Sequence, residues 1–144
     1  MHISVGGPKI LIVDDESAIS DTLALIFEKN GFTVRVAYSA EQAIETISSW
    51  SPDVALLDVM LPGMNGIDFA IVLKDNHPHC RLLFFSGSES AAALLEEAGK
   101  RGYIFDILAK PAHPLELLQR ARALLAADFE GNGESTVPGG ANCR

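Results

Sequence analysis

The chain has 144 residues, of which 48% are hydrophobic, which suits one domain with a full hydrophobic core and argues against disorder. Its formal net charge of −8 repels phosphate backbones, so direct nucleic-acid binding is not expected. The start, MHISVGGPK, lacks a signal-peptide core, no apolar run is long enough to cross a membrane, and the two cysteines form no motif, so the expected compartment is the cytoplasm.

Strand signals and helix signals alternate along the chain. Each strand signal is a short apolar or alternating run, and most of the helix signals show apolar residues recurring at helical spacing. The predicted elements in chain order, strand and helix in turn and starting with a strand, are 9–13, 17–30, 32–37, 39–48, 53–57, 67–76, 81–86, 89–102, 103–109 and 114–128.

Turn and capping residues support these boundaries. Gly31 ends the first helix, Ser39 and Gln42 form a capping-box signature for the second, and Pro114 opens the last at a first-turn position. The strands are short, and the central ones are apolar on both faces, which favours a parallel sheet covered by helices on each side. We therefore predict a single three-layer, doubly wound α/β domain with five strands and five helices.

The two ends of the chain differ from this pattern. Residues 1–8 are expected to form a flexible N-terminus ahead of a domain over residues 9–128. Residues 129–144, FEGNGESTVPGGANCR, are rich in Gly and have no periodicity, so we predict a disordered tail. No internal repeat and no second domain are expected.

Polar residues stand where the predicted strands end. Ligands of open parallel sheets bind outside the carboxyl ends of the strands, so these side chains are expected to converge. They are Asp14 and Asp15 after the first strand, Asp58 after the third, Ser86 and the adjacent Gly87 at the fourth, and Lys110 after the fifth.

The chemistry of this set indicates phosphoryl transfer. Crowded carboxylates repel one another, and all-oxygen ligands suit a hard divalent cation such as Mg²⁺. A carboxylate such as Asp58 can also act as a nucleophile and form an aspartyl phosphate. The metal, the Lys110 ammonium and the Ser86 hydroxyl would neutralise the phosphoryl charge, and Gly87 leaves room for the incoming group.

Four segments carry a resemblance to a known family. ILIVDDE, LLDVMLPGMNG, FFSGS and LAKP, in this order and at these spacings, resemble the CheY-like receiver domains of two-component response regulators over residues 9–127. The resemblance implies strand order 2-1-3-4-5 and a phosphoryl group taken from a sensor histidine kinase or a phosphotransfer protein. It also implies signalling through an output protein by a monomer or weak phosphorylation-dependent dimer, rather than turnover of an external substrate.

The resemblance also implies roles for the acidic residues and for one backbone carbonyl. Asp58 matches the phosphorylated aspartate of the family. Asp14 and Asp15 match the acidic pair that holds Mg²⁺ or Mn²⁺ together with Asp58, and Asp15 is favoured over Asp14 as the direct ligand. Met60 matches the residue whose backbone carbonyl completes the protein's share of the coordination.

The switch residues match the family with one departure. Ser86 matches the hydroxyl residue that moves toward the phosphoryl group, and Lys110 precedes Pro111 through a peptide bond that is usually cis in the family. The family usually carries Tyr or Phe three residues before the lysine, and Ile107 stands there in this chain. The usual aromatic switch therefore cannot operate, and Phe105, two residues back on the same strand face, would need a register shift to replace it.

Two other functions remain as alternatives. A phosphorylation-independent pseudo-receiver would bind partners without modification, and Ile107 keeps this hypothesis open. An aspartate-nucleophile phosphatase of the haloacid dehalogenase type needs a second acid two residues after the nucleophile, where this chain has Met60. The segment HPHC, residues 77–80, is better explained as a loop with a proline turn than as a metal site, because no second ligand cluster completes it.

Overall fold

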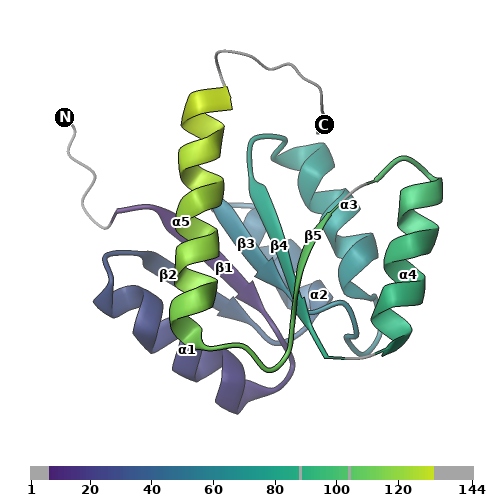
Figure 1. Ribbon diagram of the computed structural model, residues 1–144, viewed down its shortest axis with the longest axis horizontal. Helices are drawn as coiled ribbons and strands as arrows, with labels where there is room; N and C mark the ends of the chain where they lie inside the picture. The colour runs from purple at the N-terminus through teal and green to yellow at the C-terminus, as the bar shows by residue number, and fades with distance from the viewer. Residues whose placement is uncertain (1–6, 88, 104, 132–144) are drawn as a thin grey trace.

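Five parallel strands form one sheet between two layers of helices in the computed structural model, which describes residues 7–87, 89–103 and 105–131 (Figure 1). The strands are β1 (Lys9–Val13), β2 (Thr33–Ala37), β3 (Val54–Leu57), β4 (Arg81–Ser86) and β5 (Asp106–Ala109). The helices are α1 (Ser17–Lys29), α2 (Ala40–Ile47), α3 (Gly66–Asn76), α4 (Glu89–Lys100) and α5 (Pro114–Gly131). The strand order is β2-β1-β3-β4-β5, which confirms the predicted doubly wound fold.

Each face of the sheet has its own hydrophobic core. Helices α1 and α5 cover one face, while α2, α3 and α4 lie on the other (Figure 1). All of β3 is buried, as is β1 after Lys9, because both strands are covered on both faces. This burial explains why the two segments read as continuous apolar runs rather than alternating ones.

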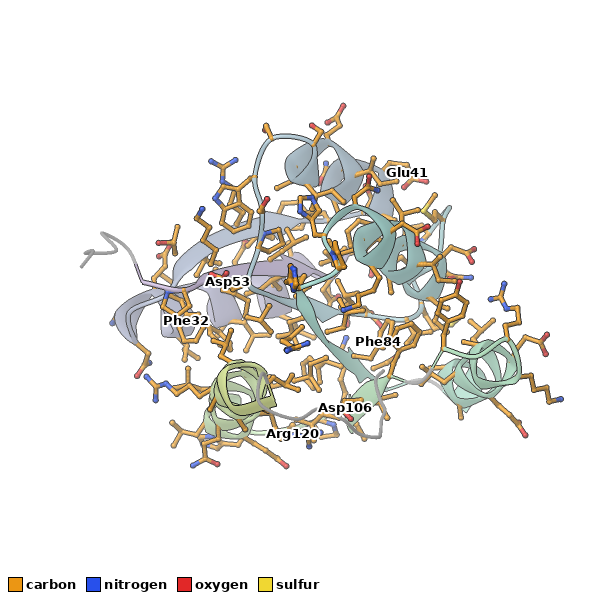
Figure 2. All side chains as sticks on the ribbon, turned by 90° about the horizontal axis from the view of Figure 1, so that it is seen from above. Phe32, Glu41, Asp53, Phe84, Asp106 and Arg120 are labelled. Atoms are coloured by element: carbon orange, nitrogen blue, oxygen red, sulfur yellow. The ribbon has the colours of Figure 1, made fainter. Side chains whose placement is uncertain are left out.

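Strand β5 is shorter than predicted, because Tyr103 and Phe105 before it make contacts with α4 and with Phe84 instead. The prediction of a strand from residue 103 was wrong, since β5 begins at Asp106. The backbone N–H of Tyr103 donates to the Ala98 carbonyl at 2.9 Å and so closes the end of α4. The ring of Phe105 packs edge-on against Phe84, with centroids 5.1 Å apart. Phe84 itself is buried inside the molecule (Figure 2).

Helix α5 continues three residues past its predicted end near residue 128. It reaches Gly131, so residues 129–131 are helical rather than part of a disordered tail. The rest of the predicted tail, residues 132–144, and residues 1–6 of the predicted flexible N-terminus lie outside the described residues. Within the described part of the chain, no helix combines the length and the apolar character needed to cross a membrane.

The HPHC segment is tied to the body of the protein by hydrogen bonds. The His77 Nε2 atom lies 2.9 Å from the Ile47 carbonyl oxygen at the end of α2. The Lys74 ammonium donates to the carbonyls of Pro78 and Cys80, both at 2.9 Å. These contacts hold the connection between α3 and β4 in one conformation, and the ring of His77 links this connection to the end of α2.

Cys80 is expected to be unreactive in the folded protein. Burial raises the pKa of its thiol to about 12, so very little reactive thiolate forms at neutral pH. Because the pKa of the thiol rises on folding, its protonated form contributes to stability at any pH below the ordinary pKa of 9.0. This contribution is lost as the pH rises through the folded-state pKa of about 12.

The variant Cys143→Ser, which leaves Cys80 as the single thiol, tests this expectation. With Ellman's reagent at about pH 8 the folded variant should react at least tenfold more slowly than the same variant in urea. Equal rates in the two states would contradict the burial of Cys80.

Candidate functional site

The backbone hydrogen-bond ladder of the sheet continues one step beyond three of its strands and positions the site. Asp14, Asp58 and Lys110 each follow a strand directly, and each donates its backbone N–H to the last residue of a neighbouring strand. The pairs are Asp14 to Ala37 at 3.2 Å, Asp58 to Val13 at 2.9 Å and Lys110 to Ser86 at 3.1 Å. The register of the parallel sheet therefore places all three residues at one edge.

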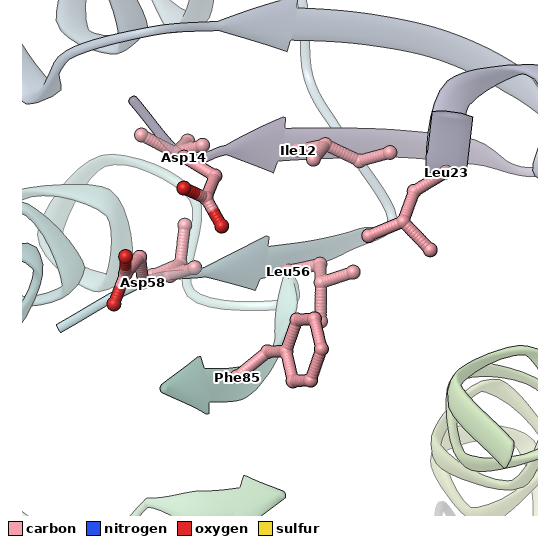
Figure 3. A pocket seen from close by; sticks show the side chains of 8 residues that line it. Ile12, Asp14, Leu23, Leu56, Asp58 and Phe85 are labelled. Atoms are coloured by element: carbon pink, nitrogen blue, oxygen red, sulfur yellow. The ribbon is translucent and has the colours of Figure 1, made fainter. Parts of the chain in front are cut away.

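The Lys110 ammonium lies among three carboxylates. Its Nζ atom is 2.9 Å from Asp14 Oδ2, 3.1 Å from Glu16 Oε1 and 3.4 Å from Asp58 Oδ2. The Asp14 and Asp58 carboxylates stand side by side at the ends of β1 and β3 (Figure 3). A Cβ atom at Gly87 would lie 3.2 Å from the Cβ of Lys110, so the glycine lets the lysine stem pass close to the end of β4.

Each buried acid also accepts a backbone hydrogen bond from a residue two positions later. Asp14 Oδ1 accepts the N–H of Glu16 at 3.0 Å, and Asp58 Oδ1 accepts the N–H of Met60 at 3.2 Å. The remaining oxygen of each carboxylate faces Lys110. Both side chains are therefore held in one orientation by local backbone and by the lysine together.

The crevice next to the two acids is lined mainly by apolar side chains. Ile12, Leu23, Leu56 and Phe85 lie beside Asp14 and Asp58, and the crevice leaves no room for a water molecule (Figure 3). Water therefore does not reach the carboxylates through this crevice, and a bound cation or an incoming group does not approach from its side.

This environment shifts the pKa of both Asp14 and Lys110. Burial raises the pKa of the Asp14 carboxyl, although the hydrogen bonds from Glu16 and Lys110 oppose the rise. Burial by itself would lower the pKa of Lys110, but the hydrogen bond to Asp14 and the charges of Asp14 and Asp58 outweigh it and raise that pKa. Lys110 is therefore a permanent cation at neutral pH.

The carboxylates suit a divalent cation. Asp14, Glu16 and Asp58 each offer an oxygen, and these oxygens all lie within 4.8 Å of one another. Such an all-oxygen set fits Mg²⁺, which takes one or two carboxylates and keeps several waters. Glu16 was not predicted from the sequence, although it is the third acid of the DDE run. Asp15 is exposed and outside this group, so its role as direct ligand stays a prediction.

Ser86, Met60 and the bond between Lys110 and Pro111 also lie at this edge, whereas Ile107 lies within β5 opposite Phe84. Ser86 is 5% exposed, and its Oγ atom has no hydrogen-bond partner among the described residues. Met60 is 40% exposed beside Asp58, and the peptide bond between Lys110 and Pro111 is cis. Ile107 is 41% exposed, so the aliphatic residue at the switch position is not buried in the core.

A second residue that sequence reasoning missed is Gly66, the first residue of α3. A Cβ atom there would overlap the carbonyl oxygen of Asp58 and lie 3.0 Å from the Cα of Val59. The N–H of Gly66 donates to the Val59 carbonyl at 2.8 Å. The glycine lets the start of α3 press directly on the backbone of Asp58.

A doubly wound parallel sheet with acids, a hydroxyl and an ammonium at its strand ends defines a CheY-like α/β domain. The chain belongs to the response regulator receiver domain family, whose model matches residues 10–122. Receiver domains of this family serve two-component systems.

Relatives and solved structures agree with this assignment. Regulatory protein VanR of Enterococcus faecium is 35% identical over 117 residues, which cover 81% of this chain and 49% of VanR. The chain thus spans about half the length of the curated relatives it matches. A CheY-like receiver domain protein from Methanospirillum hungatei JF-1 has a TM-score of 0.75 and 27% identity, covering 85% of this chain and 97% of that one.

A response regulator from Burkholderia pseudomallei was solved with a phosphorylated aspartic acid, a calcium ion and citrate. Its TM-score is 0.71 at 25% identity, and the match covers 88% of this chain and 73% of that one.

Proposed function

We propose that this receiver domain takes a phosphoryl group onto Asp58 from a sensor histidine kinase or a phosphotransfer protein in the cytoplasm. The observation that carries the proposal is the shared position of three groups at one edge of the sheet. The Asp58 carboxylate, the Lys110 ammonium 3.4 Å away and the unpartnered Ser86 hydroxyl supply a nucleophile, a fixed charge and a free donor.

The phosphoryl step uses these groups in order. An oxygen of Asp58 attacks the phosphorus, an O–P bond forms, and the P–N bond of the phosphohistidine breaks with its electron pair left on nitrogen. Lys110 is free to exchange its contact with Asp58 for one with a phosphoryl oxygen. The hydroxyl of Ser86 donates to a second phosphoryl oxygen, which gives this buried atom the partner that it lacks.

A divalent cation, Mg²⁺ or Mn²⁺, would supply further charge neutralisation when bound. Asp14, Asp58 and either Asp15 or Glu16 are the side chains that would hold it, together with the backbone carbonyl of Met60. The all-oxygen donor set of Asp14, Glu16 and Asp58 supports this choice of metal.

The output is proposed to be a contact with another protein, chosen by the phosphorylated conformation. Ile107 has no ring to swing inward, and Phe105 is already packed on Phe84. A phosphorylation-independent interaction module is the second candidate, and the exposed aliphatic side chain of Ile107 is the observation that favours it. We also propose that the domain hydrolyses its own acyl phosphate. It is not proposed to turn over an external substrate, because Met60 stands where an aspartate-nucleophile phosphatase has its second acid.

Intact mass after incubation with acetyl phosphate and Mg²⁺ tests the proposal. The wild type should gain one phosphoryl group, and Asp58→Asn should gain none, because the amide is not a nucleophile. Asp75→Asn, which changes an exposed carboxylate on α3, is the control and should behave as wild type.

Modification of Asp58→Asn would place the acceptor elsewhere. A wild type that binds Mg²⁺ and gains no mass would favour the phosphorylation-independent module.

A further inference from the structure

The loop between β3 and α3 carries Met60, whose carbonyl is the proposed backbone ligand for the cation. The N–H of Met60 bonds the Asp58 carboxylate at one end of the loop, and the N–H of Gly66 bonds the Val59 carbonyl at the other. Buried Leu61 anchors the chain in the core. The segment 62–65 has no fully buried residue, and Met64 packs only partly against the core, so polar contacts also act on its shape.

A glutamate on another helix makes such a contact. Glu41 lies in the first turn of α2, and its Oε2 atom accepts the backbone N–H of Met64 at 3.2 Å. The start of α2 is itself fixed, because Ser39 Oγ accepts the N–H of Gln42 at 3.1 Å. Glu41 is on the outer surface of the molecule (Figure 2), so its contact reaches the loop from outside.

Gly63 makes room for this contact. Its φ of +75° is a conformation that glycine adopts without strain, and a Cβ atom there would lie 2.9 Å from Glu41 Oε2. A side chain at position 63 would therefore displace the carboxylate from Met64. The absence of a side chain at Gly63 therefore leaves the space that the Glu41 carboxylate occupies.

We propose that Glu41 is a positioning residue that holds the loop between β3 and α3 in the shape that presents the Met60 carbonyl to the cation. This inference rests on the proposed function. A loop already held in the binding conformation loses less conformational entropy when the cation binds, so removing the contact weakens binding without removing a ligand.

Three variants separate this role from a simple effect of charge. Glu41→Ala removes the acceptor, Glu41→Gln keeps an oxygen acceptor without the charge, and Glu45→Ala removes an equivalent exposed charge one turn along α2. The readouts are hydrogen exchange at the Met64 amide in metal-free protein and the Mg²⁺ dissociation constant by calorimetry. Circular dichroism verifies that each variant is folded.

Glu41→Ala should speed exchange at Met64 and raise the Mg²⁺ dissociation constant, each by about three- to fivefold, as expected for one lost hydrogen bond to a charged group that is open to solvent. Glu41→Gln should recover most of both effects, and Glu45→Ala should leave both near wild type. Unchanged exchange at Met64 in Glu41→Ala, or equal losses of Mg²⁺ affinity in Glu41→Ala and Glu45→Ala, would overturn the inference alone. A wild type that binds no Mg²⁺ would overturn both this inference and the proposed function.

Discussion

Replacing Gly66 with alanine is expected to lower the free energy of unfolding by about 2–4 kcal/mol. The added methyl would overlap the Asp58 carbonyl oxygen and crowd the Cα of Val59, and both neighbours are backbone atoms that cannot rotate away. Helix propensity alone predicts the opposite sign, because alanine in a helix is favoured over glycine by about 1 kcal/mol. The sign of the change therefore separates the close approach at Asp58 from helix propensity.

Gly99→Ala in α4 is the matched control for Gly66→Ala. A Cβ atom at Gly99 meets nothing within 4 Å, so this variant should be as stable as wild type or gain up to about 1 kcal/mol. Urea unfolding of the three proteins gives the comparison. A Gly66→Ala protein as stable as wild type would show that α3 can draw back from Asp58 at little cost.

Replacing Lys110 with methionine is expected to lower the unfolding free energy by about 2 kcal/mol in metal-free buffer. The change leaves Asp14 and Asp58, whose side chains are 5% and 9% exposed, without the ammonium that balances them. The proposed Mg²⁺ site uses the same carboxylates as Lys110, so Mg²⁺ should stabilise Lys110→Met more than it stabilises wild type. Urea unfolding with and without Mg²⁺ measures both effects.

Lys100→Met, at the exposed end of α4, is the control for Lys110→Met. It removes the same charge from a helix end, whereas the described ion pairs of Asp14, Glu16 and Asp58 are made by Lys110. Stability and its Mg²⁺ dependence should therefore stay close to wild type. If Mg²⁺ stabilised Lys110→Met and wild type equally, the lysine and the cation would not share their carboxylate partners.

The site residues that could be predicted from sequence are those that directly follow a strand or end one. Asp14, Asp58, Ser86 and Lys110 were predictable because apolar runs mark the strands and the carboxyl ends of parallel strands meet at one edge. Glu16 could not be selected over Asp15, since the backbone turn at the start of α1 decides which carboxylate faces inward, and that turn has no signature in the letters DDE.

Contacts between segments distant along the chain were also beyond sequence reasoning. The bond from Glu41 to Met64 joins residues 23 positions apart, and neither carries a pattern that points to the other. The start of β5 was mispredicted for a related reason. Tyr103 and Phe105 are residue types that favour a strand. The backbone of Tyr103, however, bonds the end of α4, and the ring of Phe105 packs on Phe84.

The backbone hydrogen bond from Asp58 to Val13, one residue beyond β3, fixes the position of Asp58 relative to the sheet. The two ends of the sheet should therefore differ in how they tolerate a change of chain length. Side chains alternate between the faces of a sheet, so deleting one residue within Val54–Leu57 would turn the Asp58 carboxylate to the opposite face. At the opposite edge of the sheet, where Asp53 accepts the N–H of Lys9, the described parts of the connections carry none of the site residues named above. A change of chain length in those connections is therefore expected to disturb the acidic site less than a change of length within β3.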